Sequence, residues 1–316
     1  MGLIVSKVLV VFIYIGVGFA ACKGGLIGKD AVKGLNMLVL NIASPCLLIS
    51  SITSRKLNDR LFKNTIIMFV LTIVFFILLS IFTVWLSRRM GMDDDARANV
   101  LAVGMTACNS GFMGIPVAQS VFGGLTFYYV IIQNIAFNLY IYIMSIMQFN
   151  HGVKKVSGKV TLRKAIMPFI NVLTISAVAS IVLLFARISL PQYALDIFST
   201  LGNVCIPVSM IIVGINLTEG SLMSHFTNPK ILITSLIKLI GVPALTLAIV
   251  YPMPLDPLVK LATVLCMTFP TAVITVALAA REDRDSGLMS ECVATSTLLS
   301  VVTLPVWMII LTTLFL

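Results

Sequence analysis

The chain carries about ten apolar stretches, each close to the ~20 residues that an α-helix needs to cross the hydrocarbon core of a membrane. Apolar residues make up 59% of the 316 residues and charged residues only 11%, whereas a soluble domain carries about a quarter charged residues. Backbone groups in lipid must be paired within the chain, which favours helices. The sequence therefore predicts an all-α polytopic membrane protein with ten transmembrane helices, at residues 3–22, 32–54, 62–86, 97–122, 125–149, 164–186, 192–217, 229–250, 257–280 and 287–315.

The net charge of +10 is concentrated in the connections between these stretches. Fourteen Lys and Arg side chains, among them Arg88, Arg97 and Lys154, lie in odd-numbered connections, and five, among them Arg55 and Arg187, lie in even-numbered ones. Cytoplasmic connections carry the excess of basic residues. We therefore expect a multi-pass protein of the cell membrane with a cytoplasmic central loop and both termini outside. The charge reflects topology and gives no reason to expect nucleic acid as a partner.

Two motifs recur in the two halves of the chain. "NIASP" (41–45) in the second stretch and "NVCIP" (203–207) in the seventh both read Asn-x-x-x-Pro, and prolines interrupt the fourth and ninth stretches. A repeat of five helices is odd in number, so its second copy enters the membrane the opposite way round, as in many secondary transporters. We predict two inverted five-helix repeats, residues 1–149 and 164–316, joined by a cytoplasmic linker at 150–163, with broken crossing helices four and nine.

The fourth stretch contains "ACNSGFMGIPVAQ" (107–119), which is unusual for a membrane helix. Gly111, Gly114 and Pro116, with Pro270 in the ninth stretch, are predicted to mark a helix crossover. Because proline fits the first turn of a helix, Pro116 and Pro270 are each expected to start a second half-helix. The backbone amides just after each proline would then be free to bind an anion. A single kink could also serve packing alone.

Polar side chains near these breaks are the candidate contacts for such an anion. Those in the fifth stretch are costly if they face lipid, so they should face protein or a cavity. Hydrogen bonding between helices is the alternative role. The predicted substrate-binding residues are Asn109, Ser110, Gln133, Asn134, Asn138 and Thr268.

Two ionisable residues, Lys238 and Glu291, lie inside the eighth and tenth stretches. Both fall in the half of the membrane predicted to be cytoplasmic, so an ion pair is geometrically possible. The two residues could be structural, as a satisfied pair or as snorkelling side chains, or protonation or cation binding at the pair could couple to transport.

Several function classes lack the residues that they need. His151 and His225 lie in connections, and the spans show neither paired acids nor metal-ligand spacing, so no enzyme activity, metal or cofactor is expected. ATP-driven transport by this chain would need a GxxxxGK[ST] loop, which is absent. The six cysteines show no CxxC spacing and are expected to act as small buried apolar residues.

The residues "NSGFMGIP" (109–116) resemble the helix-break motif of the auxin efflux carrier family, which includes bacterial and archaeal relatives of the plant PIN auxin transporters. "QNIAFN" (133–138), "LPQYALDIFSTLGNVCIPVSMIIVGINL" (190–217) and "IKLIGVP" (237–243) resemble further segments of the family, and the likeness covers essentially the whole chain. The resemblance implies two inverted repeats, with spans one, two, six and seven as a scaffold and the others as a moving transport domain. It also implies that Asn109, Gln133 and Asn134 contact substrate, and it suggests a homodimer through the scaffold helices.

These observations together predict a secondary active transporter of small organic anions, in particular carboxylates, with elevator-type alternating access and substrate at the helix crossover. Bacterial members of the family are labelled malate or malonate permeases. A proton or sodium ion is the expected coupling ion. Residues 64–80 lack the acid and base found in the third span of the plant proteins, and the short central loop argues against auxin as substrate. The alternative is a membrane-embedded binding or sensor subunit without net transport.

Overall fold

The computed structural model describes every residue except 1, 29, 56–57, 93, 154–171 and 219–227, and all regular elements in the described part are helices. In the part of the chain that the structure describes, seven helical segments are long and apolar enough to cross a membrane, judged by length and composition: Ala31–Thr53, Asp59–Arg88, Asp95–Val121, Gly124–Asn150, Gln192–Asn216, Pro229–Val250 and Ser286–Phe315. Three shorter apolar helices, Leu9–Lys23, Val172–Phe185 and Pro257–Met267, fall in the first, sixth and ninth predicted stretches. The prediction of an all-helical membrane protein is confirmed. The predicted linker at 150–163 lies mostly outside the described residues.

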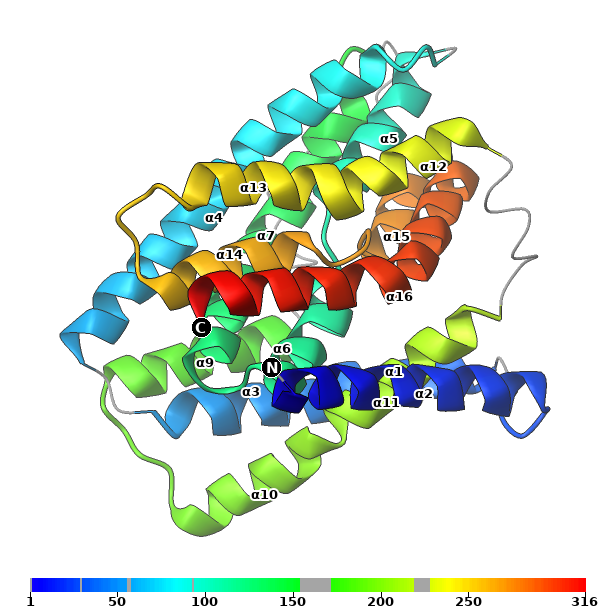
Figure 1. Ribbon diagram of the computed structural model, residues 1–316. Coiled ribbons are helices and arrows are strands. Elements are labelled where there is room, and N and C mark those ends of the chain that lie inside the picture. The colour runs from blue at the N-terminus through cyan, green and yellow to red at the C-terminus, as the bar shows by residue number, and fades with distance from the viewer. Residues whose placement is uncertain (1, 29, 56–57, 93, 154–171, 219–227) are drawn as a thin grey trace.

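The helices pack as two layers, seen one below the other in Figure 1. The lower layer contains α1 (Gly2–Lys23), α2 (Ala31–Leu38), α3 (Ser44–Thr53), α9 (Val172–Phe185), α10 (Gln192–Asn203) and α11 (Cys205–Asn216). Gly18 on α1 and Gly214 on α11 each lie where a Cβ atom would collide with the backbone of the other helix. A Cβ added to Gly202 on α10 would stand 2.7 Å from the backbone of Leu47 on α3. Small residues thus let these backbones approach, as is usual between helices in lipid.

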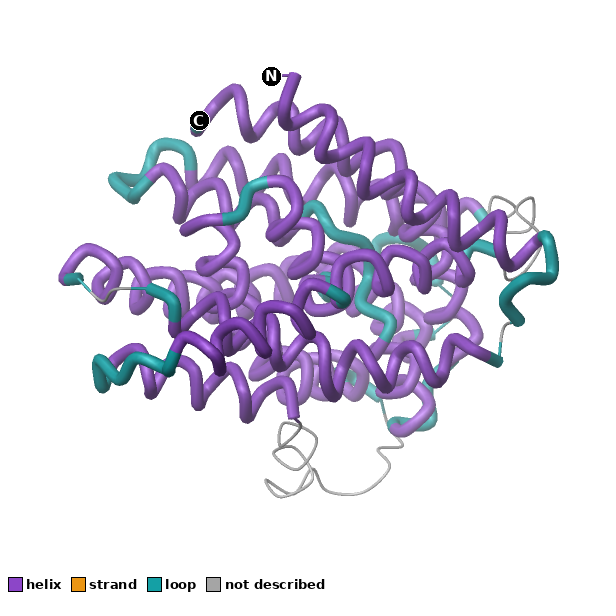
Figure 2. Tube along the Cα trace, turned by 90° about the horizontal axis from the view of Figure 1, so that it is seen from below, coloured by secondary structure: helices purple, strands orange, loops and turns teal. Residues whose placement is uncertain are grey.

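The upper layer contains α4 (Asp59–Arg88), α5 (Asp95–Thr106), α7 (Gly124–Asn150), α12 (Pro229–Leu236), α13 (Val242–Val250), α14 (Pro257–Met267), α15 (Ile274–Arg281) and α16 (Ser286–Phe315). Helix α4 packs against α5 and α7, α14 packs against α7, and α16 packs against α12, α14 and α15. Aromatic rings fill the α4–α7 contact, where Phe76 stacks on Tyr140 with 4.7 Å between ring centroids. The second half of the fourth span, α6 (Ile115–Val121), contacts α1 and α11 of the lower layer and α7 of the upper layer. The two ends of the chain lie close together in both views (Figures 1 and 2).

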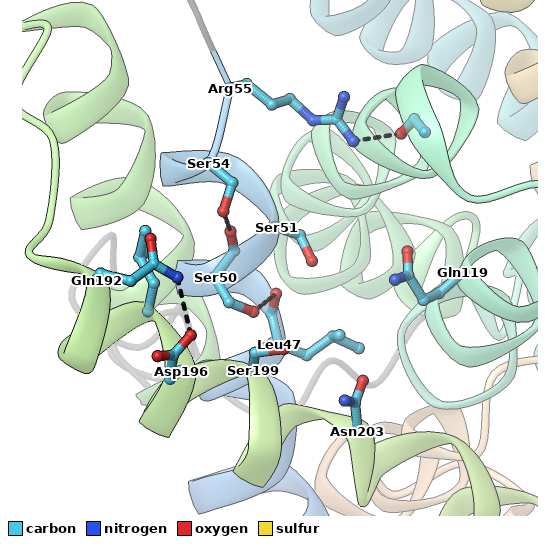
Figure 3. A pocket seen from close by; sticks show the side chains of 12 residues that line it. Leu47, Ser50, Ser51, Ser54, Arg55, Gln119, Gln192, Asp196, Ser199 and Asn203 are labelled. Carbon is cyan, nitrogen blue, oxygen red and sulfur yellow. Dashed lines mark hydrogen bonds between the residues drawn. The ribbon is translucent and has the colours of Figure 1, made fainter.

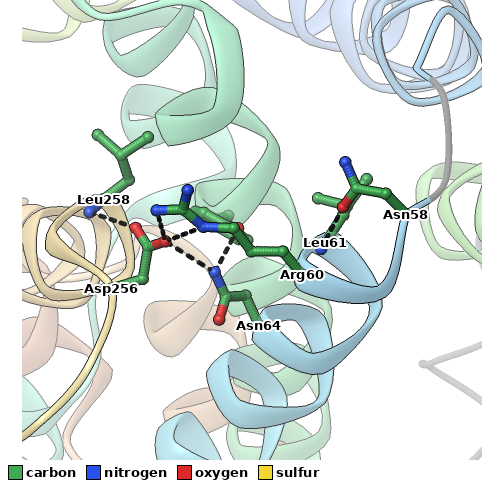
Figure 4. A network of polar contacts seen from close by, with 7 residues as sticks. Asn58, Arg60, Leu61, Asn64, Asp256 and Leu258 are labelled. Carbon is green, nitrogen blue, oxygen red and sulfur yellow. Dashed lines mark hydrogen bonds and ion pairs between the residues drawn. The ribbon is translucent and has the colours of Figure 1, made fainter.

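A polar network fixes one end of the upper layer (Figure 4). Asp256 accepts hydrogen bonds from the Leu258 N–H at 2.9 Å, from the Asn64 amide at 3.0 Å and from Arg60 at 2.7 Å. The same Asn64 amide donates to the Tyr129 hydroxyl at 3.1 Å. Burial alone would raise the pKa of Asp256, but Arg60 and the two amides outweigh it and hold the pKa below its ordinary value. The network ties α4, α7 and α14 together.

Within the described residues, three π-helical turns interrupt the helices, and each ends two residues before a proline. They are η1 (Val39–Ala43) before Pro45, η2 (Ser110–Gly114) before Pro116 and η5 (Ile237–Gly241) before Pro243. Proline inside an α-helix clashes with the carbonyl four residues earlier. A π turn widens the backbone at that point, so the chain continues as helix through each proline.

Candidate functional site

Two helix breaks meet in the centre of the molecule. The first, at residues 107–109, separates α5 from η2, and the second, at 268–273, separates α14 from α15. The backbone N–H of Asn109 donates to the carbonyl oxygen of Pro270 at 2.7 Å. The ring of Phe269 lies against Gly114, where an added Cβ would stand 2.8 Å from the ring atom Cε2. The two breaks are thus far apart in the sequence but in contact in the structure, and together they form one crossover.

Asn109 is the residue at which the second half of the fourth span begins. Its carbonyl accepts hydrogen bonds from the N–H groups of Met113 and Gly114 at 3.2 and 3.0 Å. Its side chain makes no capping hydrogen bond and is 7% exposed. The first amides of a helix lack partners within it and carry partial positive charge. The Asn109 side-chain amide therefore lies, without a partner among the described residues, at a helix N-terminus suited to an anion.

The predicted polar residues of the fourth and fifth spans cluster around this helix start. The Asn134 amide donates to the Ser110 hydroxyl at 2.9 Å, and the Asn138 amide donates to the Asn134 side-chain oxygen at 3.3 Å. Gln133 donates to the sulfur of Cys108 at 3.7 Å. Ser110 and Gln133 are fully buried, whereas Asn138 is half-buried. These hydrogen bonds hold a polar chain from the break toward the surface.

The second break differs from its prediction in how its polar groups are used. The Thr268 hydroxyl is fully buried and donates to the Leu265 carbonyl at 2.7 Å, so it caps its own helix. The N–H of Thr271 was expected to be free, but it donates to the Ser296 hydroxyl at 3.1 Å. The Thr271 hydroxyl in turn donates to the Gly104 carbonyl at 2.7 Å. A buried backbone N–H group needs a hydrogen-bond acceptor, and the Ser296 hydroxyl on α16 is that acceptor for Thr271.

The prediction that Pro116 starts the second half-helix needs correction. Pro116 does lie in the first turn of α6, but helical backbone begins earlier, with the π turn at Ser110. The amides of Val117 and Ala118 therefore lie inside the helical segment and not at its free end. The π turn accommodates the proline without a break, which is why the proline does not mark the start.

The possible ion pair of Lys238 and Glu291 is not formed in the structure. Glu291 is exposed, whereas Lys238 is fully buried and its Nζ has no hydrogen-bond partner among the described residues. The two residues were expected at similar depth, but α16 turns Glu291 outward. The contact between η5 and α16 is made instead by Trp307, which donates to the Leu239 carbonyl at 2.8 Å.

A polar cavity of about 590 Å³ lies between the two layers, where α3, α10 and the α6–α7 connection meet (Figure 3). We call it the vestibule. Arg55 at its rim donates to the Gly124 carbonyl at 2.5 Å and lies 5.6 Å from the Tyr128 ring centroid. Burial lowers the pKa of Arg55, but arginine stays charged at neutral pH. The remaining polar lining residues are Ser50, Ser51, Ser54, Gln119, Gln192, Asp196, Ser199 and Asn203.

Comparison with known proteins agrees with this geometry. Residues 3–308 match the family described as "Membrane transport protein". The chain belongs to this family, the auxin efflux carriers. It is also 25% identical over 307 residues, 97% of this chain and 98% of the other, to a protein of Methanothermobacter thermautotrophicus (strain ATCC 29096 / DSM 1053 / JCM 10044 / NBRC 100330 / Delta H) described as an uncharacterized transporter. The resemblance seen in "NSGFMGIP" is thereby confirmed, and this auxin efflux carrier family member is a membrane transporter.

The vestibule of this auxin efflux carrier family member was not predicted. Its signal is present in the sequence, because Gln192, Asp196, Ser199 and Asn203 follow the i, i+4, i+7, i+11 spacing of one helix face. The prediction of buried cysteines is confirmed for five of the six, and Cys22 is half-buried.

Proposed function

We propose that this auxin efflux carrier family member is a secondary active transporter of small organic anions, in particular carboxylates, which bind at the helix crossover. The observation that carries the proposal is the side-chain amide of Asn109 at the start of η2, which makes no capping hydrogen bond. The backbone N–H of the same residue donates to the Pro270 carbonyl of the other break. A carboxylate there would meet partial positive charge from the helix end and hydrogen-bond donors from the backbone. Asn134 and Asn138 extend the polar path from this point.

An arrangement of ten spans in two inverted five-helix repeats, residues 1–149 and 164–316, underlies this mechanism. The pairing of the two breaks supports it, as does the contact between the two Asn-x-x-x-Pro motifs, where the hydroxyl of Ser44 lies 3.2 Å from the sulfur of Cys205. The proposed orientation, with both termini exterior, follows from the distribution of basic residues. Broken helices at matching places in two repeats are typical of secondary transporters.

Movement of the upper layer against the lower layer would give elevator-type alternating access. The lower layer would be the scaffold, and homodimers would form through it. In the proposed orientation the vestibule opens outward, because it lies beside the even-numbered connections. Arg55 at its rim would attract anions toward the crossover by its charge. A proton or a sodium ion would supply the driving force.

Uptake into proteoliposomes tests the proposal. Purified protein would be given lactate, malonate, malate and succinate in turn, with and without imposed proton or sodium gradients. We expect accumulation of at least one anion above its external concentration when a gradient is imposed. Saturable binding without gradient-driven accumulation would favour the alternative, a binding or sensor subunit without net transport.

A further inference from the structure

Lys238 is a buried cationic side chain for which the proposed binding site has no use. It lies in η5, is fully buried, and its Nζ has no hydrogen-bond partner among the described residues. Burying an ammonium group without a partner is so costly that such a group neutralises or gains a counter-charge. The Leu239 carbonyl next to it is held by Trp307, so this turn is fixed against α16.

The turn that holds Lys238 packs beside the crossover. It contacts α5, and one helical turn before Lys238 the Thr234 Cγ2 would stand 3.5 Å from a Cβ added to Gly104 on α5. The carbonyl of the same Gly104 accepts a hydrogen bond from the Thr271 hydroxyl of the second break. Cys108 lies in the first break, two residues after the end of α5.

A second buried polar atom without a partner belongs to Gln133, which contacts the thiol of Cys108. Gln133 donates to Cys108 through Nε2, and its Oε1 has no partner among the described residues. The buried part of the described chain thus holds a donor without an acceptor, the Lys238 Nζ, and an acceptor without a donor, the Gln133 Oε1. Unsatisfied buried groups of this kind need a functional explanation.

No carboxylate holds the charge of Lys238 in the described part of the chain. The elements packed against η5 are α5, α12, α13 and α16. Their charged residues at described positions are Asp95 and Arg97 in the first turns of α5, Lys230 on α12, and the exposed Glu291 on α16, while α13 has none. The buried thiol of Cys292 on α16 is a further titratable group on these elements.

We propose that Lys238 carries the coupling proton of this transporter, so that the transported anion and one proton move together. This inference rests on the proposed function. With the crossover empty, the neutral amine is the form that is cheap to bury. When an organic anion binds, its charge stabilises the ammonium form, and Nζ takes up one proton from water. When the anion is released, the ammonium group of Lys238 loses this proton to water again.

The test compares exchange with accumulation in proteoliposomes whose membrane potential is clamped at zero. The variants are Lys238→Met, Lys238→Gln and the matched control Lys260→Met, whose lysine is near the surface and donates to the Tyr251 carbonyl. Malate exchange at equal pH reports binding and movement. A pH gradient of about one unit can drive at most about tenfold accumulation for one proton per anion. We expect that ratio to be approached by the wild type and by Lys260→Met, and to fall to about one in Lys238→Met. Exchange should be retained in Lys238→Met at saturating malate, with a weaker affinity for malate because the ammonium and the anion stabilise each other.

Three results would overturn the inference. Accumulation by Lys238→Met equal to that of the wild type would show that the proton is carried elsewhere. Loss of exchange in both folded Lys238 variants would assign the residue to anion binding and not to coupling. Accumulation by the wild type that follows sodium and ignores pH would exclude the proton. Failure of the wild type to exchange malate or any other anion of the panel would instead reject the proposed function, and this inference with it.

Discussion

The backbone N–H of Asn109 donates a 2.7 Å hydrogen bond to the carbonyl oxygen of Pro270. These residues belong to different broken helices, so each break is held open by a group from the other. Closing either helix would leave a buried backbone group without its partner, which is costly. The two breaks should therefore respond as one unit to changes at either.

Gly114 tests how tightly the two breaks are packed. Its Cβ would stand 2.8 Å from the Phe269 ring, so Gly114→Ala should force the crossover apart and lower stability by about 1–3 kcal/mol. The matched control is Gly241→Ala in another π turn, where the nearest atom to an added Cβ is a side-chain carbon of Ile237 at 3.7 Å. Thermal unfolding in detergent measures both variants. Equal melting temperatures for the two would contradict the close contact of the breaks.

Pro116 lies inside the second half of the fourth span and does not create the break. Pro116→Ala should therefore leave residues 107–109 non-helical and reduce transport less than Asn109→Ala does. Pro45→Ala is the control, because Pro45 follows a π turn in the same way but lies in the lower layer. Initial uptake rates compare the three variants. If Pro116→Ala lowered the initial uptake rate more than Asn109→Ala does, the binding site would begin at the proline, contrary to the structure.

Lys238 and Glu291 should behave independently, since one is buried and the other exposed. In a double-mutant cycle of Lys238→Met and Glu291→Gln, the stability changes should add to within about 0.5 kcal/mol. Breaking a buried ion pair would instead cost about 3–5 kcal/mol, recovered in part by the double variant. If the double variant recovered stability in this way in thermal unfolding, the two residues would form an ion pair after all.

Asp256 should make stability depend on pH. Its pKa is lowered in the folded protein, so its contribution is complete above the unfolded value of about 3.9 and is lost as the pH falls through the folded value. The melting temperature of Asp256→Asn should accordingly lie below that of the wild type at pH 6, and the gap should close in strongly acidic buffer. Arg60→Gln should show the same trend more weakly, because Arg60 is 77% exposed at its side chain. A gap that stays constant with pH would exclude this carboxylate as the source.

The helices could be predicted because apolar length alone favours them in lipid. The place where the fourth span breaks was predicted too late in the chain, since a π turn lets Pro116 sit inside a helix. The polar cluster of Ser110, Asn134 and Asn138 could be named from the cost of facing lipid. Which of these side chains donates to which depends on how α7 packs against its neighbours, and this packing could not be predicted from the sequence.

The ion pair that is not formed and the missed vestibule have a common cause. Position along a span predicts depth in the membrane, but rotation about the helix axis is set by packing against neighbours. Glu291 was predicted to lie at a similar depth to Lys238, but its side chain is exposed whereas that of Lys238 is buried. The polar face of α10 could have been found from its spacing, yet the cavity needs Ser50 and Ser54 of the second span opposite it.

Binding of the transported anion to Asn109→Ala tests the central claim most directly. The variant removes a side-chain amide that makes no hydrogen bond within the described residues, so the fold should keep its stability. A hydrogen bond to a charged group contributes about 1.5–3 kcal/mol, so affinity should fall about 10- to 150-fold. Calorimetric titration of the purified protein, with thermal unfolding as the control for folding, gives both values. Unchanged affinity in a folded, transport-competent Asn109→Ala protein would contradict the account, because the anion would then bind elsewhere.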